Sequence, residues 1–221
     1  MTGVKARRAR RPDLRPTMCL TTFPSATRVS AERPAAFPQT QDALLRELAD
    51  ATERVTRFGE SLRELADVEL NARPGEGRWS AAECLEHLNR YAAHYLPQLE
   101  HRARQAAPRR HATYRPGLLG KPFALAMHPA RRARTMRSPA AMNPLGSALD
   151  AGLVVADFLG YQARYAALVD ALRGRELRGS RIPLSLSRLI RFHLGDLLAC
   201  LVWHHERHGD QAAEALAQTA A

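Results

Sequence analysis

Residues 203–211 read Trp-His-His-Glu-Arg-His-Gly-Asp-Gln, and they lie in a stretch whose apolar side chains recur every three or four positions. This spacing predicts one face of an amphipathic helix, which we place at about 184–219. Its inward stripe consists of Leu194, Leu197/Leu198, Leu201, His204/His205, His208, Ala212 and Ala215/Leu216. Histidines therefore interrupt a face that otherwise consists of core residues.

Three further segments show the same helical period. The first spans about 40–70 and the third about 148–173. The second begins at a capping box, in which Ser80 and Glu83 satisfy the first free backbone donors, and we expect Pro97 to bend or loosen this helix beyond its middle. Its inward stripe consists of Cys84, His87/Leu88, Tyr91 and Tyr95. Four long amphipathic helices without strand-like alternation predict an all-α four-helix bundle.

Two segments do not share this helical pattern. Residues 1–36 hold eight Lys/Arg and two acids and show no apolar period, which predicts a disordered basic tail ahead of a single domain at 37–221. Residues 108–144 are rich in Arg and Pro and predict a long extended connection between the second and third helices. The part at 108–137 holds eight basic residues and no acid. The net charge of +11 thus lies outside the helices, which argues against nucleic-acid binding by the bundle.

Composition also bears on the cellular compartment. The three cysteines, Cys19, Cys84 and Cys200, are few, odd in number and widely spaced, which argues for a reducing compartment and against a disulfide framework. No stretch reaches the roughly 18 uncharged apolar residues that a membrane-spanning helix requires. The sequence therefore predicts a soluble cytoplasmic protein without a membrane partner.

Three histidines have the pattern of a metal site. His204 and His208 lie one helical turn apart, so their imidazoles can share a divalent cation at about 2.0–2.1 Å. His205 also lies near His208, and helical geometry leaves His204 and His205 as rivals. His87 is the natural third ligand, because it lies in the apolar stripe of another helix. Three neutral histidines with one open position are typical of a catalytic metal site.

Each of these residues also has an ordinary structural role. His87 alone is more often a hydrogen-bonded core or surface histidine. Cys84 and Cys200 precede histidines by three and four positions and allow a mixed Cys/His site, although cysteine is commonly a small core residue. Trp79 is by default a hydrophobic staple before the capping box. Acids that could orient the imidazoles, but are more often solvated surface residues, are Glu86, Asp196, Glu206 and Asp210.

Two segments resemble motifs of a known family. Residues 78–88, Arg-Trp-Ser-Ala-Ala-Glu-Cys-Leu-Glu-His-Leu, resemble the W-S-x-x-E-x-x-x-H-L opening of the second helix in DinB-like (damage-inducible, DinB superfamily) proteins. Residues 203–211 resemble the H-x-x-x-H-x-x-Q segment of their last helix. The motifs keep the order and separation of the family, and the resemblance spans roughly 40–219. It implies an up-down-down-up four-helix bundle with a long connection between helices 2 and 3.

The resemblance also implies a three-histidine site for zinc, nickel or a similar divalent ion. When the ligand positions of the family are carried over to this sequence one by one, they fall on His87, His204 and His208. The resemblance therefore implies His204, and not His205, as the ligand. Relatives include metal-dependent thiol transferases that use low-molecular-weight thiols such as bacillithiol, mycothiol or glutathione, and many others have no known reaction. The basic tail and the Arg-rich connection depart from the family pattern.

We therefore expect a metal-dependent enzyme of the thiol-transferase or hydrolase-like type, whose small-molecule substrate is a low-molecular-weight thiol. The Arg-rich segment 108–137 would attract an anionic substrate. No general base stands out, because nothing separates Glu83 or Glu86 from cap and surface residues. One alternative is a non-catalytic metal-binding or stress-associated bundle that forms a homodimer. Another is nucleic-acid binding through the basic tail, for which the sequence shows no recognised DNA-binding motif.

Overall fold

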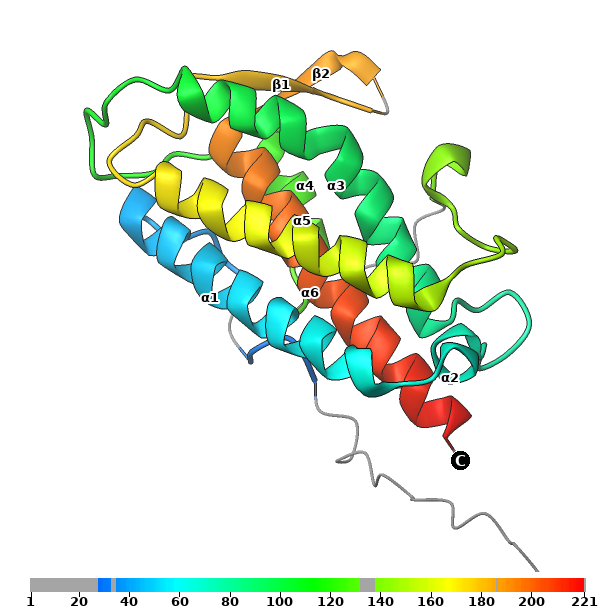
Figure 1. Cartoon of the computed structure of the whole chain (residues 1–221). Coiled ribbons are helices and arrows are strands. Elements are labelled where there is room, and N and C mark those ends of the chain that lie inside the picture. The colour runs from blue at the N-terminus through cyan, green and yellow to red at the C-terminus, as the bar shows by residue number, and fades with distance from the viewer. Residues whose placement is uncertain (1–27, 33–34, 132–137, 186, 221) are drawn as a thin grey trace, which may run out of the picture.

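The computed structural model describes residues 28–32, 35–131, 138–185 and 187–220, and four long helices form its main body. They are α1 (Gln41–Ser61), α3 (Ala81–Arg104), α5 (Ala151–Ala171) and α6 (Leu194–Thr219). α1 and α3 each pack against both α5 and α6. Figure 1 shows α1 and α6 running in one direction along the bundle and α3 and α5 running in the other. The apolar faces of the four helices meet in a buried core, as their spacing predicts.

Side-chain caps fix where the long helices begin. The predicted capping box is present: Ser80 Oγ accepts from the amide of Glu83 at 3.1 Å, and the Glu83 carboxylate accepts from the amide of Ser80 at 3.0 Å. Thr40 and Asp150 cap α1 and α5 in a similar way. The helix α3 continues through Pro97 to its last residue. Its capped start sets the position of His87, two turns further along.

The first helix is shorter than predicted. It ends at Ser61, and a 3₁₀ turn (Leu62–Glu64) and the short helix α2 (Asp67–Asn71) follow. The prediction of one helix over 40–70 is therefore wrong at this end. Leu62 and Leu70 are both buried, so the apolar period continues across the break and conceals it. The Glu69 side chain accepts from the amide of Ala66 and starts the new helix.

The last helix begins at Leu194 and not near residue 184. The segment before it forms an antiparallel hairpin of β1 (Arg181–Leu184) and β2 (Ser187–His193). Buried and exposed side chains alternate along β1, and Pro183 lacks the amide donor that a helix interior needs. The expectation of a helix without strands is wrong here, because the alternation covers too few residues to stand out beside a long helical period. The described chain is otherwise mainly helical.

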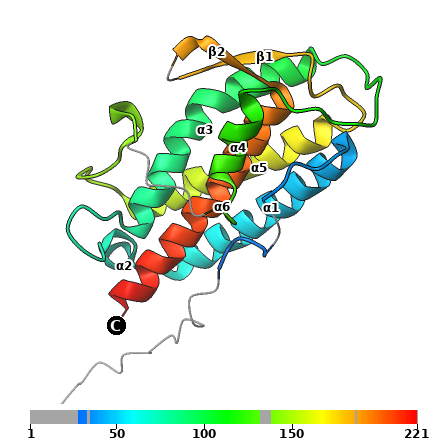
Figure 2. The same ribbon diagram turned by 180° about the vertical axis from the view of Figure 1, so that it is seen from behind.

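The connection expected at 108–144 is not wholly extended. Residues Gly120–Met127 form α4, which packs along α6, as Figure 2 shows from behind. Asp196, in the first turn of α6, accepts from Tyr114 Oη at 2.7 Å and from the amide of Gly117 at 2.9 Å. A Cβ at Gly120 would lie 2.2 Å from the same carboxylate, so this close approach requires glycine. One buried acid thus holds the connection against the bundle.

Part of the expected tail contacts the bundle. The amide of Ser30 donates to the Asp210 carboxylate at 2.9 Å, its hydroxyl donates to the other oxygen of that carboxylate, and Val29 is buried against Gly209. Residues 1–27 and 33–34 of the predicted tail lie outside the described residues.

No helix within the described residues is long and apolar enough to cross a membrane. Cys84 and Cys200 are buried free thiols, whereas Cys19 lies outside the described residues.

Candidate metal centre

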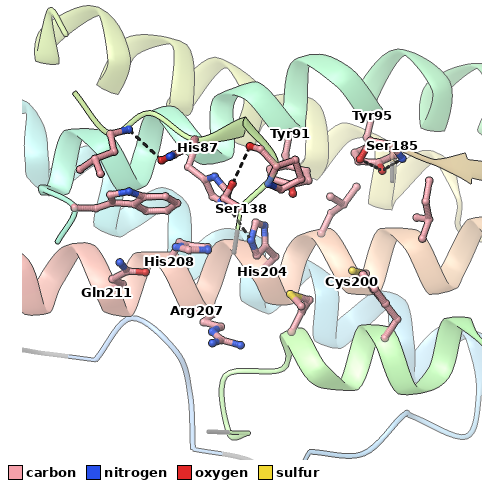
Figure 3. Close-up of a pocket in the computed structure, with 18 of the residues that line it drawn as sticks. His87, Tyr91, Tyr95, Ser138, Ser185, Cys200, His204, Arg207, His208 and Gln211 are labelled. Carbon is pink, nitrogen blue, oxygen red and sulfur yellow. Dashed lines mark hydrogen bonds between the residues drawn. The ribbon is translucent and has the colours of Figure 1, made fainter. Parts of the chain in front are cut away.

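Three histidine side chains from two helices meet inside the bundle. His87 on α3 faces His204 and His208 on α6, as Figure 3 shows. Each ring offers one nitrogen, and these three atoms all lie within 4.8 Å of one another. His87 and His204 are buried and His208 is half-buried. The antiparallel packing of α3 against α6 thus brings together the three residues that the sequence singled out.

The spacing of two ring nitrogens matches a shared cation. His87 Nε2 lies 3.3 Å from His204 Nε2. Two nitrogens that each lie about 2.0–2.1 Å from one tetrahedral ion are separated by roughly 3.4 Å. A cation between these two rings therefore needs almost no change in their separation.

A backbone carbonyl fixes the tautomer of His87. Its Nδ1 lies 2.6 Å from the carbonyl oxygen of Met142, which can only accept a hydrogen bond. The proton of the neutral ring must then sit on Nδ1, and the lone pair on Nε2 faces His204. A carbonyl that orients a histidine in this way is the usual outer partner of a metal ligand.

His208 also has a nitrogen available to a cation. Its Nδ1 is buried and has no hydrogen-bond partner among the described residues. A buried polar atom without a partner is costly, and a metal ion bound through this nitrogen would satisfy it. The donor set, three imidazoles without a carboxylate, suits zinc, nickel and similar ions better than magnesium or calcium. The three side chains thus fit a divalent transition metal.

Burial keeps the three rings neutral at pH 7. Desolvation lowers the pKa of His87 to about 4, although its bond to Met142 opposes the shift. The pKa values of His204 and His208 are well below the usual value, first through burial and then through neighbouring histidines and Arg207. Because only neutral imidazole binds a metal, protons compete little for this site near neutral pH.

We expect the metal-free protein to lose stability as the pH falls from about 6.5 towards 4. Burial also lowers the pKa of His205, to about 3, so His205 and the three histidines of the cluster are neutral in the folded state. In this pH window the unfolded chain binds more protons than the folded chain, so stability rises with pH. Each histidine contributes a slope of up to about 1.4 kcal/mol per pH unit. Urea unfolding of the metal-free protein at several pH values measures this slope, and a flat profile between pH 4 and 6.5 contradicts it.

The structure separates His204 from its rival His205. His205 Nδ1 lies 2.8 Å from Nε2 of Gln162 on α5, and its ring centroid lies 4.8 Å from that of Tyr165. Its side chain therefore faces α5 and is not part of the cluster. Helical geometry in the sequence left this choice open, and the packing of α6 between two neighbours decides it.

The other candidate side chains have partners away from the cluster. Glu86 pairs with Arg90, Asp196 with Tyr114, Glu206 with Arg54, and Asp210 with Ser30. Cys84 is buried in the apolar core, and Cys200 lies on the wall of the cavity described below. Burial raises the pKa of the Cys200 thiol to about 12, so the thiol stays protonated. None of these groups joins the three imidazoles.

Sequence reasoning missed three neighbours of the cluster. The ring centroids of Trp79 and Tyr91 lie 4.7 and 4.9 Å from that of His87. Tyr91 follows His87 by one helical turn, which is the signal that could have placed it here. The Met142 carbonyl had no such signal, because a backbone group carries no residue type. Trp79, predicted to be a staple, also packs near His208.

The cluster lies on the wall of a cavity of about 550 Å³. Residues of α3, α6, α4, the hairpin and the connection line it. Cavities of this size hold organic ligands rather than single water molecules. Among the described residues that line it, none is an Asp or Glu.

The fold and the site together define a helical bundle with a three-histidine cluster that can hold a metal ion. The model of the DinB superfamily matches residues 47–212, which include both histidine segments. The chain belongs to the DinB superfamily. No curated protein and no solved structure matches it.

Proposed function

We propose that this protein is a metal-dependent enzyme that transfers a low-molecular-weight thiol to an electrophile. The observation that carries the proposal is the position of the three histidines on the wall of a cavity of about 550 Å³. Three histidine ligands would leave one coordination position of a tetrahedral ion open, and all three side chains line the cavity from which a further ligand would approach. An open position beside a ligand-sized cavity favours catalysis over a purely structural metal site.

A bound divalent cation lowers the pKa of a thiol or water ligand. The protein would contribute His87, His204 and His208 as ligands. The Met142 carbonyl holds the ring of His87 in position, and the rings of Trp79 and Tyr91 pack beside it. The thiol sulfur forms a bond to the electrophilic carbon, the leaving group departs with the bonding electrons, and the thiol proton passes to solvent.

No Asp or Glu is among the described residues that line the cavity, and this favours a thiol over water as the nucleophile. Metal-dependent hydrolases commonly use a Glu or Asp as general base beside the metal. The described cavity wall carries no such group, and Glu83 and Glu86 pair with arginines instead. A thiolate needs no general base once its proton has left. Because hydrolysis commonly uses a general base and thiol transfer does not, we favour thiol transfer over hydrolysis.

The test is thiol consumption by metal-loaded protein. Protein stripped with a chelator and reloaded with Zn²⁺ or Ni²⁺ is mixed with bacillithiol, mycothiol or glutathione and with 1-chloro-2,4-dinitrobenzene. We expect at least one thiol to be consumed faster with metal-loaded protein than with stripped protein. His204→Ala should fall to the uncatalysed rate, whereas His101→Ala, an exposed histidine on α3, should keep the parent rate. Equal rates for loaded and stripped protein with all three thiols would leave a non-catalytic metal-binding bundle as the better description.

A further inference from the structure

The cavity extends along α6 on both sides of the histidine cluster. Its lining residues on this helix run from Leu197 to Ala215, which is about 27 Å of helix. The cluster lies near the middle of that length. Figure 3 shows the order along α6, with Gln211 on one side of the cluster and Cys200 on the other. The cavity therefore has two arms that meet at the histidines.

Among the residues that the structure describes, one arm is lined by no charged side chain. We call it the apolar arm, and it lies between α3, the first turns of α6, α4 and the hairpin. Its described lining residues include Tyr91, Tyr95, Phe123, Leu184, Leu197 and Cys200, together with the neutral polar Ser185. The polar end of Tyr95 is already satisfied, because its hydroxyl accepts from the Ser185 amide at 2.8 Å and donates to Ser185 Oγ at 3.0 Å. The aromatic ring of Tyr95 is therefore the part of this side chain that a ligand would contact.

The other arm is polar. We call it the polar arm, and its lining residues include Arg78, Trp79, Asn143, Gln211 and Ala215. Arg78 donates to Gln218 at 2.7 Å and keeps its charge at this end of the cavity. Arg207 lies level with the cluster, donates to the Ala126 carbonyl at 3.1 Å, and extends towards α4 in Figure 3. The two arms thus differ in charge as well as in position.

This contrast restricts what each arm can hold. A charged ligand in the apolar arm would lose its hydration and find no partner of opposite charge, which is strongly unfavourable. A neutral aromatic or aliphatic group gains from burial against the tyrosine and leucine side chains. A polar molecule that reached the cluster through the other arm would meet hydrogen-bonding side chains instead.

We propose that the apolar arm is the binding subsite for a neutral aromatic or aliphatic electrophile, placed beside the histidine cluster and across it from the polar arm. This assignment rests on the proposed thiol transfer for the role of the occupant, but binding of an apolar molecule can be measured without any reaction. The two arms then allow two substrates to approach the same point from opposite sides.

Two matched substitutions on α6 test the assignment. Cys200 and Ala215 are small buried residues that line opposite arms. The probe is N-phenyl-1-naphthylamine, a neutral molecule whose fluorescence rises in apolar surroundings, titrated into Zn²⁺-loaded protein. Cys200→Phe fills the apolar arm and should weaken probe binding by roughly tenfold or more, because the added ring takes up space that the probe needs. Ala215→Phe should leave probe affinity within about twofold of the parent.

A second measurement needs no substitution and covers the case in which Cys200→Phe does not fold. The ¹⁹F relaxation of 1-fluoronaphthalene is compared between Co²⁺-loaded and Zn²⁺-loaded parent protein. We expect strong relaxation by Co²⁺ only, because the apolar arm adjoins the cluster. No difference between the two metals, or loss of probe binding in Ala215→Phe but not in Cys200→Phe, overturns the assignment. If the protein consumes thiol but Cys200→Phe binds the probe as the parent does, only the assignment of the apolar arm is wrong. If the probe binds in the apolar arm but no thiol is consumed, only the proposed reaction is wrong.

Discussion

Purified protein is expected to contain a stoichiometric divalent metal ion, and the His204→Ala variant is expected to contain almost none. His204 is buried and its Nε2 lies 3.3 Å from that of His87, so the alanine variant removes one of the three ligands from the cluster. Apparent binding free energies of about 10–16 kcal/mol for four-ligand zinc sites imply that one ligand contributes roughly 100- to 1,000-fold in affinity. Elemental analysis and competition with a zinc chelator measure both quantities. His87→Ala and His208→Ala should behave alike.

Two other histidines serve as controls for this experiment. His205→Gln replaces a buried neighbour on the same helix whose partner is Gln162, and it should keep the metal. His101→Ala replaces an exposed histidine on α3 and should be indistinguishable from the parent. Retention of stoichiometric metal by His204→Ala, or its loss from His205→Gln alone, would falsify the proposed ligand set.

Replacement of Glu83 by alanine is expected to destabilise the protein by about 2 kcal/mol, because it removes a buried carboxylate that accepts several hydrogen bonds and caps α3, although its partner Arg73 is partly exposed. The carboxylate is 2% exposed and accepts from Arg73 at 2.6 and 2.9 Å. It also completes the capping box with Ser80 and accepts from the amide of Gly146 at 3.1 Å. Although burial raises it, the pKa of Glu83 lies below its usual value through these hydrogen bonds. Urea or thermal unfolding measures the loss.

The matched control is Glu86→Ala, one turn further along α3. The Glu86 side chain is 21% exposed, against 2% for Glu83, and its ion pair with Arg90 lies within one helix, so the expected change is at most about 1 kcal/mol. Glu83→Ala should also weaken metal binding, because Gly146 and Met142 belong to the same connecting segment and Met142 orients His87. Equal destabilisation by the two alanine variants would show that the Glu83 contacts do not hold the start of α3.

The sequence predicts most of the helical framework because long apolar periods dominate it. The capping box at Ser80 and the inward face of α6 are local patterns, and both appear in the structure. The start of α6 was misjudged for the opposite reason: the strand β1 is short, and its alternation merges into the helical period that follows it. The break after α1 was concealed in the same way by Leu62 and Leu70.

The histidine cluster was predictable only in part. Helical spacing pairs His208 with either neighbour, and only the packing of α6 against α3 and α5 shows that His205 faces Gln162. The carbonyl of Met142 could not be foreseen, because its position depends on how the connection folds back over α3. The cavity and its two arms also depend on tertiary packing, since their lining residues come from segments far apart in the chain.

The contact between residues 28–32 and α6 has a practical consequence for making shortened chains. Asp210 and Gly209 directly follow His208, and they are covered by Ser30 and Val29. A chain that started at Phe37 would leave the Asp210 carboxylate open to water beside a ligand candidate. Expression truncations intended to preserve the native environment of the site should therefore begin no later than Arg28.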